Sequence, residues 1–114
     1  MLKIAPSTMQ ALHAAAARDA FGRFARWWPA HALPPLAPDA LARLWRFAGE
    51  RGAELGIEDD ERGQLSLYAA AQALMPDPTV PEFMAVTDLL FDPRPLDERL
   101  AEVIAMARTR GTAH

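Results

Sequence analysis

Residues 56–78 read GIEDDERGQLSLYAAAQALMPDP, and they contain the end of one helix, a second helix and its stop without a gap. Gly56 suits the left-handed backbone just past a helix end, and residues 58–61 place four acidic side chains where a helix N-terminus exposes free N–H groups. Residues 65–75 are apolar almost all round, and Asp77-Pro78 ends the helix. Because a helix that is apolar on every side lies inside a bundle, this stretch predicts an all-α fold with a central helix.

Helix signals of the same kind flank this stretch. Residues 7–10 and 79–82 have the Ser/Thr-x-x-Glu/Gln form of a capping box, and Pro38 suits the first turn of a helix. Gly52 falls on an apolar helix face, which predicts that a neighbouring helix approaches closely there. We expect one domain over residues 1–114, an all-α bundle of four to five helices at about 8–28, 38–55, 59–75, 80–91 and 95–109.

Composition bounds the class of protein. The 114 residues are 51% hydrophobic and 24% charged, which is ordinary for a single folded domain. The absence of cysteine excludes disulfides, thiol nucleophiles and thiolate metal sites. Polar residues and Pro6 interrupt the N-terminus where a signal peptide needs an apolar run, and no apolar stretch approaches the roughly 20 residues of a membrane span. We therefore expect a cytoplasmic protein that does not cross a membrane.

Charge is divided unevenly along the chain. Residues 1–57 carry seven basic and four acidic groups, whereas residues 58–114 carry five basic and eleven acidic groups, so the chain has a net charge of −3. Such polarity steers partners, although solvated helix faces also produce it. A helix-turn-helix at residues 38–75 is a weak alternative, because its recognition helix would bring four acidic residues to the DNA phosphates.

Candidates for catalysis or metal binding are few. The only serines are Ser7, which suits a helix cap, and Ser66, and no His-Glu-x-x-His or Glu-x-x-His motif is present. A calcium loop starting at Asp59 would place Gln64 where the sharp turn needs glycine. We therefore expect no catalytic residue, metal or cofactor. The main alternative is a small ligand-binding or enzymatic bundle, with a buried cavity of roughly 300 Å³ beside His13 and Tyr68.

Two surfaces are candidates for binding a protein. Trp27 and Trp28 point about 100° apart on a helix, so one of them should lie at the margin of the core. An aromatic side chain beside arginines is typical of an interface, which favours a contact centred on Arg26, Trp28 and His31. The second surface is acidic, and charge complementarity would let it mask a basic partner. Its main candidate residues are Glu58, Asp59, Asp60, Glu61, Asp77 and Glu82.

Three sets of residues carry a resemblance to a known group of proteins. The first set opens the chain, the second surrounds the Gly–Ile turn into the acidic helix start, and the third surrounds the Asp-Pro pair before the last helix. They are Leu2, Ile4, Ser7, Met9 and Gln10; Ala53, Gly56, Ile57, Glu58, Glu61, Leu67 and Tyr68; and Asp92, Pro93, Leu96, Arg99 and Leu100. In these features the chain resembles small all-helical bacterial proteins encoded beside type VI secretion spike and effector genes.

The resemblance implies a cytoplasmic non-enzyme that handles a secreted toxin, as an immunity protein or as an adaptor for loading. It implies a protein partner, either an effector or a spike component, and it carries no catalytic residues onto this chain. The alanine-rich first helix and the connection Leu33-Pro34-Pro35-Leu36 depart from the pattern. The oligomeric state does not follow from the sequence.

Overall fold

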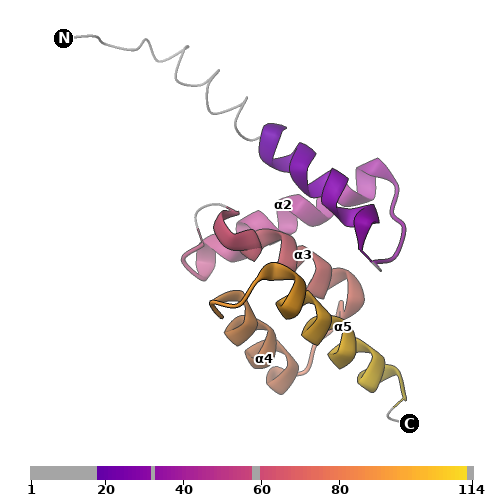
Figure 1. Cartoon of the computed structure of the whole chain (residues 1–114), viewed down its shortest axis with the longest axis vertical. Helices are drawn as coiled ribbons and strands as arrows, with labels where there is room; N and C mark the ends of the chain where they lie inside the picture. Colours follow the sequence, from indigo (N-terminus) through magenta and orange to yellow (C-terminus); the bar gives the residue numbers. More distant parts are fainter. Residues whose placement is uncertain (1–17, 32, 58–59, 113–114) are drawn as a thin grey trace, which may run out of the picture.

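The computed structural model describes residues 18–31, 33–57 and 60–112, and in these ranges it contains helices and no β-strand. The described part of the chain begins with a helix over residues 18–27, which continues directly into a 3-10 turn. The elements that follow are η1 (Trp28–Ala30), α2 (Pro38–Glu54), η2 (Glu61–Gly63), α3 (Gln64–Leu74), α4 (Val80–Leu90) and α5 (Leu96–Thr112) (Figure 1). The all-α class is therefore confirmed.

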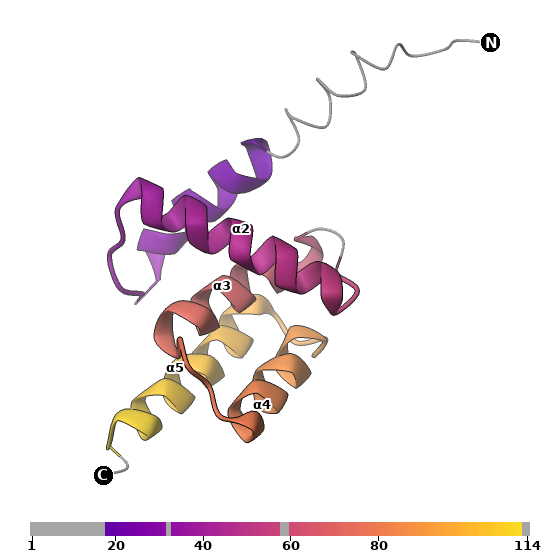
Figure 2. The same cartoon turned by 180° about the vertical axis from the view of Figure 1, so that it is seen from behind.

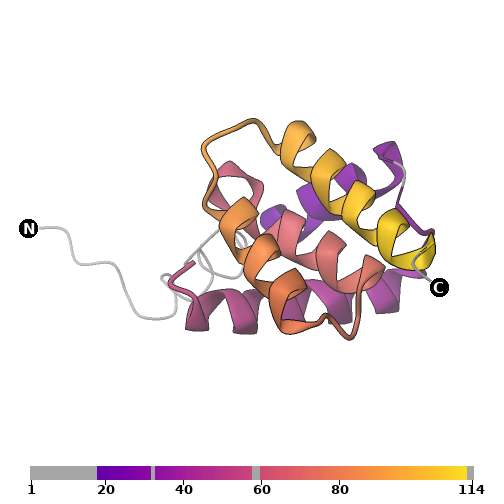
Figure 3. The ribbon, with the colours of Figure 1, turned by 90° about the horizontal axis from the view of Figure 1, so that it is seen from below.

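Helix α3 is the centre of the bundle, as its sequence predicts. It contacts α2, α4 and α5, and Figures 2 and 3 show it between α2 on one side and the α4–α5 pair on the other. Every residue from 65 to 71 is buried. The run of small residues at 69–71 lets neighbouring helices come close, while Leu67 and Tyr68 supply bulk. None of the described helices is long and apolar enough to cross a bilayer.

The turn at Gly56 adopts the predicted left-handed conformation. Gly56 has φ +87°, its N–H donates to the Ala53 carbonyl over 3.1 Å, and the Ile57 N–H donates to the Gly52 carbonyl over 2.8 Å. This pair of bonds is the Schellman motif, which satisfies the last carbonyls of α2. The close approach predicted at Gly52 is also present, because a Cβ there would lie 2.6 Å from Leu65 Cδ2 of α3.

Helix α3 begins at Gln64, so the predicted start near residue 59 is wrong. Arg62 and Gly63 both have left-handed backbones, with φ of 63° and 73°, and this conformation separates the short η2 turn from α3. The acidic run still contributes to the helix start. The Asp60 carboxylate accepts hydrogen bonds from the Ser66 N–H over 3.0 Å and from the Ser66 hydroxyl over 2.8 Å, so it satisfies an N–H of the first turn of α3.

The described aromatic residues near the N-terminal end form one cluster against α2. Phe24 stacks on Trp45 with ring centroids 4.7 Å apart and meets Trp28 edge-on at 5.5 Å. Trp28 is only 2% exposed, and its Nε1 donates to the Pro34 carbonyl over 2.6 Å. The proposed surface role of Trp28 is therefore corrected: the 3-10 turn directs its ring into the core, and Trp27 takes the half-buried position.

Arg99 is buried, at 1% exposure, although it lies on the first turns of a helix with acidic neighbours. Within the described part of the chain its guanidinium bonds main-chain oxygens alone, those of Leu89 and Leu90 at the end of α4, Arg94 before α5, and Arg62 in η2. Burial lowers the pKa of Arg99. The partial negative charge at the C-terminus of α4 has the opposite effect, because it favours the charged guanidinium. One side chain of α5 thus joins α4, which precedes it directly, and η2, which is distant in sequence.

Local signals fix the bounds of α4, whereas α5 differs from expectation. The capping box at Thr79 and Glu82 is present with both of its bonds, and Phe91 follows the last residue of α4. Helix α5 continues to Thr112 instead of ending near residue 109. Gly111 lies within its last turn, because glycine costs a helix only about 1 kcal/mol relative to alanine and does not force an end.

The capping box predicts a pH dependence of stability. The Glu82 carboxylate accepts from the Thr79 N–H over 2.8 Å, and this bond holds the pKa of Glu82 below its ordinary value of 4.5. A lowered pKa stabilises the fold above the unfolded value, and the effect is lost as pH falls through the folded pKa. We expect Glu82→Gln to lower Tm by a constant amount from about pH 7 to about pH 5, and the gap to close below about pH 4.

Thermal unfolding of both proteins, followed by circular dichroism from pH 3 to pH 7, measures this gap. Glu50→Gln is the matched control, because Glu50 is exposed on α2 and makes no hydrogen bond among the described residues. If the difference in Tm between the wild type and Glu82→Gln stayed unchanged down to pH 3, the charge of Glu82 would not support the start of α4.

Candidate functional site

Helix α4 exposes more large apolar side chains than any other part of the described surface. The four large hydrophobic residues that are exposed are Val80 (73%), Phe83 (41%), Met84 (61%) and Phe91 (49%). We call this set the α4 ridge. It exists because α4 buries Val86, Leu89 and Leu90 against the bundle, and its sequence VPEFMAVTDLL holds more apolar residues than one face can cover.

A groove runs beside the ridge, between α2, α3 and α4. The groove is open to solvent and has a volume of about 350 Å³. It is lined by Phe47, Arg51, Glu54, Leu55, Tyr68, Gln72, Pro76, Pro78 and Phe83. We call it the Tyr68 groove. Phe83 belongs to both the groove and the α4 ridge, so the two features form one continuous surface.

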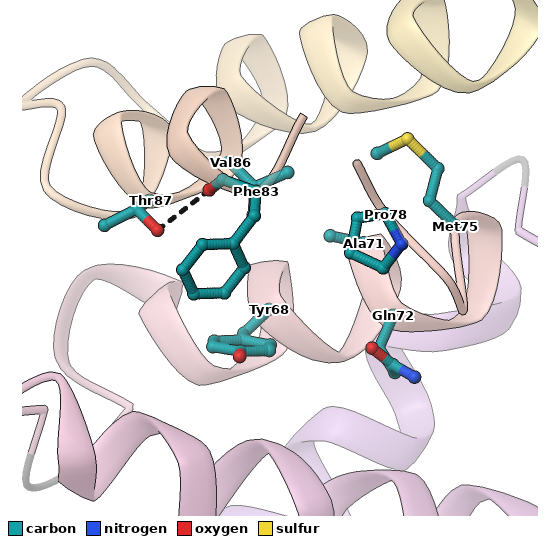
Figure 4. Close-up of a pocket in the computed structure, with 8 residues that line it drawn as sticks. All are labelled: Tyr68, Ala71, Gln72, Met75, Pro78, Phe83, Val86 and Thr87. Atoms are coloured by element: carbon teal, nitrogen blue, oxygen red, sulfur yellow. Dashed lines mark hydrogen bonds between the residues drawn. The ribbon is translucent and has the colours of Figure 1, made fainter. Parts of the chain in front are cut away.

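A smaller niche opens from the groove toward the bundle interior. It has a volume of about 30 Å³ and shares Tyr68, Gln72, Pro78 and Phe83 with the groove. Ala71, Met75, Val86 and Thr87 complete its wall. Figure 4 shows Phe83 projecting from α4 toward Tyr68 on α3, with Met75 and Pro78 at the other end of the niche. The niche is about a tenth of the cavity expected beside Tyr68, and His13 lies outside the described residues.

Polar groups of the groove come from α2 and α3. Arg51 Nη1 lies 3.4 Å from Glu54 Oε2, and the Arg51 guanidinium carbon lies 5.7 Å from the centre of the Phe47 ring. Tyr68 meets Phe47 edge-on, with centroids 6.0 Å apart. Burial raises the pKa of Tyr68; Arg51 opposes this shift and Glu54 adds to it. The Tyr68 hydroxyl is therefore protonated at neutral pH and is available as a donor.

The predicted acidic surface does not form one cluster in the described residues. Asp60 is bound at the start of α3, and Asp77 lies beyond the other end of this 11-residue helix, which is about 16 Å long. Asp77 and Glu82 instead share Arg110 of α5, at 3.1 and 3.4 Å. Glu58 and Asp59 lie outside the described residues, as does the side chain of Glu61.

The second predicted surface is also only partly available. Arg26 is exposed, but Trp28 is buried. His31 is bound within the chain, since its Nδ1 lies 2.9 Å from the Trp27 carbonyl oxygen and its Nε2 lies 3.2 Å from Asp97 Oδ1. These contacts attach the turn after residue 30 to the start of α5. Arg26 is the member of this set whose side chain is exposed and forms no hydrogen bond or ion pair with another described residue.

The described side chains offer little for nucleophilic or metal chemistry. Ser66 is buried, at 4% exposure, and its hydroxyl is bound to Asp60 instead of to a histidine. Among the described residues no three His, Cys, Asp or Glu side chains lie together in a way that could hold a metal ion. Polar groups meet in two concave places of the described surface. In the Tyr68 groove Arg51 and Glu54 neutralise each other, and in a shallow open pocket between α4 and α5 Glu82 is paired with Arg110.

Sequence reasoning identified Tyr68 but missed the groove around it. The signal that was available is the excess of apolar residues in α4 and just after it, which at 80, 83, 84 and 91 fall outside the buried face. Comparison of the chain with protein-family models, with curated proteins and with solved structures found no match.

Proposed function

We propose that the protein is a non-enzymatic binding module that recognises a protein partner through the α4 ridge and the adjoining Tyr68 groove. The observation that carries the proposal is the ridge itself. Three of its side chains, Val80, Met84 and Phe91, are about half exposed or more, beside a concave surface that already contains Phe83. Exposed apolar side chains grouped along one helix favour association, because covering apolar surface stabilises a complex by about 25 cal/mol per Å².

The partner that we propose is a secreted effector or a spike component of a type VI system, with this chain as its immunity protein or loading adaptor in the cytoplasm. The resemblance of the Gly56-Ile57 turn and of residues 92–100 supports this choice. Charge supports it too, because the acidic second half of the chain complements a basic toxin surface, and Asp88 is exposed next to the ridge.

The alternatives receive less support. A metabolite or cofactor needs a pocket of roughly 300 Å³ or more that encloses it. The Tyr68 groove has about 350 Å³ but is open to solvent, and the niche behind it has about 30 Å³. Recognition of DNA needs a basic surface, and the helix that would enter the groove of DNA is instead the buried α3.

Co-expression with the products of the flanking genes, followed by titration of each candidate, tests the proposal. We expect Met84→Lys to weaken binding at least tenfold, because it places a charge in the centre of an apolar contact and repels a basic partner. Ala101→Lys on the exposed face of α5 is the matched control, with the same added charge at a distant site. Equal affinities for wild type and Met84→Lys would remove the ridge from the interface.

A further inference from the structure

We infer that His31 is a proton-dependent latch that holds the end of the helix over residues 18–27 against the start of α5. With two protons on its ring, His31 bridges the Trp27 main-chain carbonyl and the Asp97 carboxylate. With one proton it keeps only one of these contacts, and the turn that carries it separates from α5. We call this arrangement the His31 latch. It involves neither the α4 ridge nor the Tyr68 groove, so it is independent of the proposed function.

The ring of His31 has a hydrogen-bond acceptor at each of its nitrogens. Nδ1 lies 2.9 Å from the Trp27 carbonyl oxygen, and Nε2 lies 3.2 Å from Asp97 Oδ1. A carbonyl oxygen and an ionised carboxylate accept hydrogen bonds and donate none, whereas a neutral imidazole carries a single N–H. A neutral ring would therefore set one nitrogen lone pair against an oxygen. Only the doubly protonated ring donates to both oxygens, so the complete contact requires the charged form.

Other groups around the ring favour the charged form as well. The His31 ring packs against the Trp27 ring with centroids 4.8 Å apart, and an indole ring attracts a cation. Among the described carboxylates, that of Asp97 lies within 4 Å of the His31 ring. Glu98, the next residue in the first turn of α5, adds a second negative charge to that turn. The start of α5 therefore attracts a protonated His31 more strongly than a neutral one.

The basic side chains of the neighbouring elements are engaged elsewhere. The Arg26 guanidinium lies back beside Gly22, since a Cβ at residue 22 would meet Arg26 Nη1 at 3.3 Å. On α5, Arg99 is bonded to main-chain oxygens of η2 and of the segment before α5. The turn η1 contains no charged residue. The arginines of α2 around Trp45 are exposed and make no bond to His31 within the described part of the chain: they are Arg43 and Arg46.

The indole of Trp27 makes the closed position of this turn only weakly stable. Its Nε1 is buried and has no hydrogen-bond partner among the described residues, whereas Trp28 Nε1 donates to the Pro34 carbonyl over 2.6 Å. A buried donor without an acceptor raises the free energy of the packed state, because in water it would be bonded. Loosening of the turn lets water reach the Trp27 N–H. The two bonds of His31 therefore decide whether the turn stays closed.

The latch opens as the pH rises, and the opening is local. Histidine side chains as a class change charge between about pH 5 and pH 8. Because the closed form needs the charged ring, its stabilisation is present at the acid end of this range and is lost toward the alkaline end. Phe24 stacks on Trp45 with centroids 4.7 Å apart, and this contact contains no titratable group. It keeps the helix over residues 18–27 on α2 while the turn after it separates from α5.

Exchange of the indole N–H protons with water, measured by NMR on the whole chain, tests the latch. We expect Asp97→Asn to speed exchange of the Trp27 N–H about two- to fivefold at pH 6, because it removes the charge that His31 contacts. The factor is modest because the Asp97 side chain is 82% exposed and solvent screens the pair. At pH 8 the exchange rates of Asp97→Asn and wild type should become equal. The Trp28 N–H, bonded to Pro34, is the internal reference and should keep its rate.

Glu98→Gln is the matched control, because it removes the same charge from the same turn of α5 and should leave Trp27 exchange unchanged. His31→Phe keeps a ring against Trp27 but has no N–H, so it should speed exchange at least as much as Asp97→Asn, and adding Asp97→Asn to it should have no further effect. Equal rates for Asp97→Asn and wild type at pH 6, an equal effect of Glu98→Gln, or an effect as large at pH 8 as at pH 6 would overturn the inference. A parallel rise at Trp28 would overturn it too, since the opening would then not be confined to the latch.

Discussion

Arg99→Met should lower the free energy of unfolding by about 3–5 kcal/mol, a large share of the 5–15 kcal/mol that stabilises a typical domain. The variant removes the side-chain donor to the carbonyl oxygens of Arg62 and Arg94 in a buried place. The carbonyl oxygens of Leu89 and Leu90 lose their bonds from Arg99 but keep those from the Asp92 N–H and from Gln64 Nε2. Methionine fills most of the volume, so the loss reports hydrogen bonding more than packing. Urea denaturation followed by circular dichroism measures it through the midpoint and slope.

The competing effect is the cost of burying a guanidinium to which none of the described carboxylates is bonded. That cost is real, because burial lowers the pKa of Arg99. It is offset by four oxygens, two of which belong to the C-terminal end of α4, where the helix dipole favours a cation. If the burial cost were larger, Arg99→Met would be neutral or stabilising, as happens for some buried ion pairs.

Two further variants sharpen the result. Arg99→Lys keeps the charge but replaces a planar fork by a single point, so it cannot reach Arg94 and Arg62 together and should recover only part of the loss. Arg108→Met on the exposed side of α5 is the matched control, and we expect it to change stability by no more than about 0.5 kcal/mol. Equal midpoints for Arg99→Met and Arg108→Met would refute the role of Arg99.

Local signals in the sequence predicted the elements that depend on neighbouring residues. Gly56, Pro38 and the pair Thr79–Glu82 each act within about four positions, so the end of α2 and the starts of α2 and α4 follow from them. The apolar run of residues 65–75 predicted the central helix for the same reason, since a segment that is apolar on every side has to be buried.

Features that depend on distant residues could not be read in this way. A helical arginine normally faces solvent, and the four acceptors of Arg99 are set by how η2, α4 and α5 meet in space. Whether Trp27 or Trp28 is buried depends on a single 3-10 turn and on the Pro34 carbonyl, which accepts the bond from Trp28. The Tyr68 groove needs three helices in their final positions, so the sequence could offer Tyr68 as a candidate but not its surroundings.

Gly63→Ala should be the second most damaging of the substitutions considered, at about 2–4 kcal/mol. Two effects add here. An alanine at φ +73° costs about 1–2 kcal/mol, and its Cβ would lie 2.6 Å from Leu96 Cδ2 of α5, which adds about 1–2 kcal/mol of overpacking. Gly63 therefore limits how close η2 comes to α5, beside the bond from Arg99 to the Arg62 carbonyl.

Gly56→Ala separates the two effects, because Gly56 also has a positive φ, +87°, but a Cβ there meets nothing within 4 Å. We expect Gly56→Ala to lose only the backbone part, about 1–2 kcal/mol, so that the difference between the two variants measures the contact with Leu96. Leu96→Ala in the Gly63→Ala background should then recover part of the loss, since it removes the side chain that the new Cβ meets. Equal losses for Gly63→Ala and Gly56→Ala would mean that Leu96 moves aside freely, and that α5 is held against η2 by Arg99 and not by close packing.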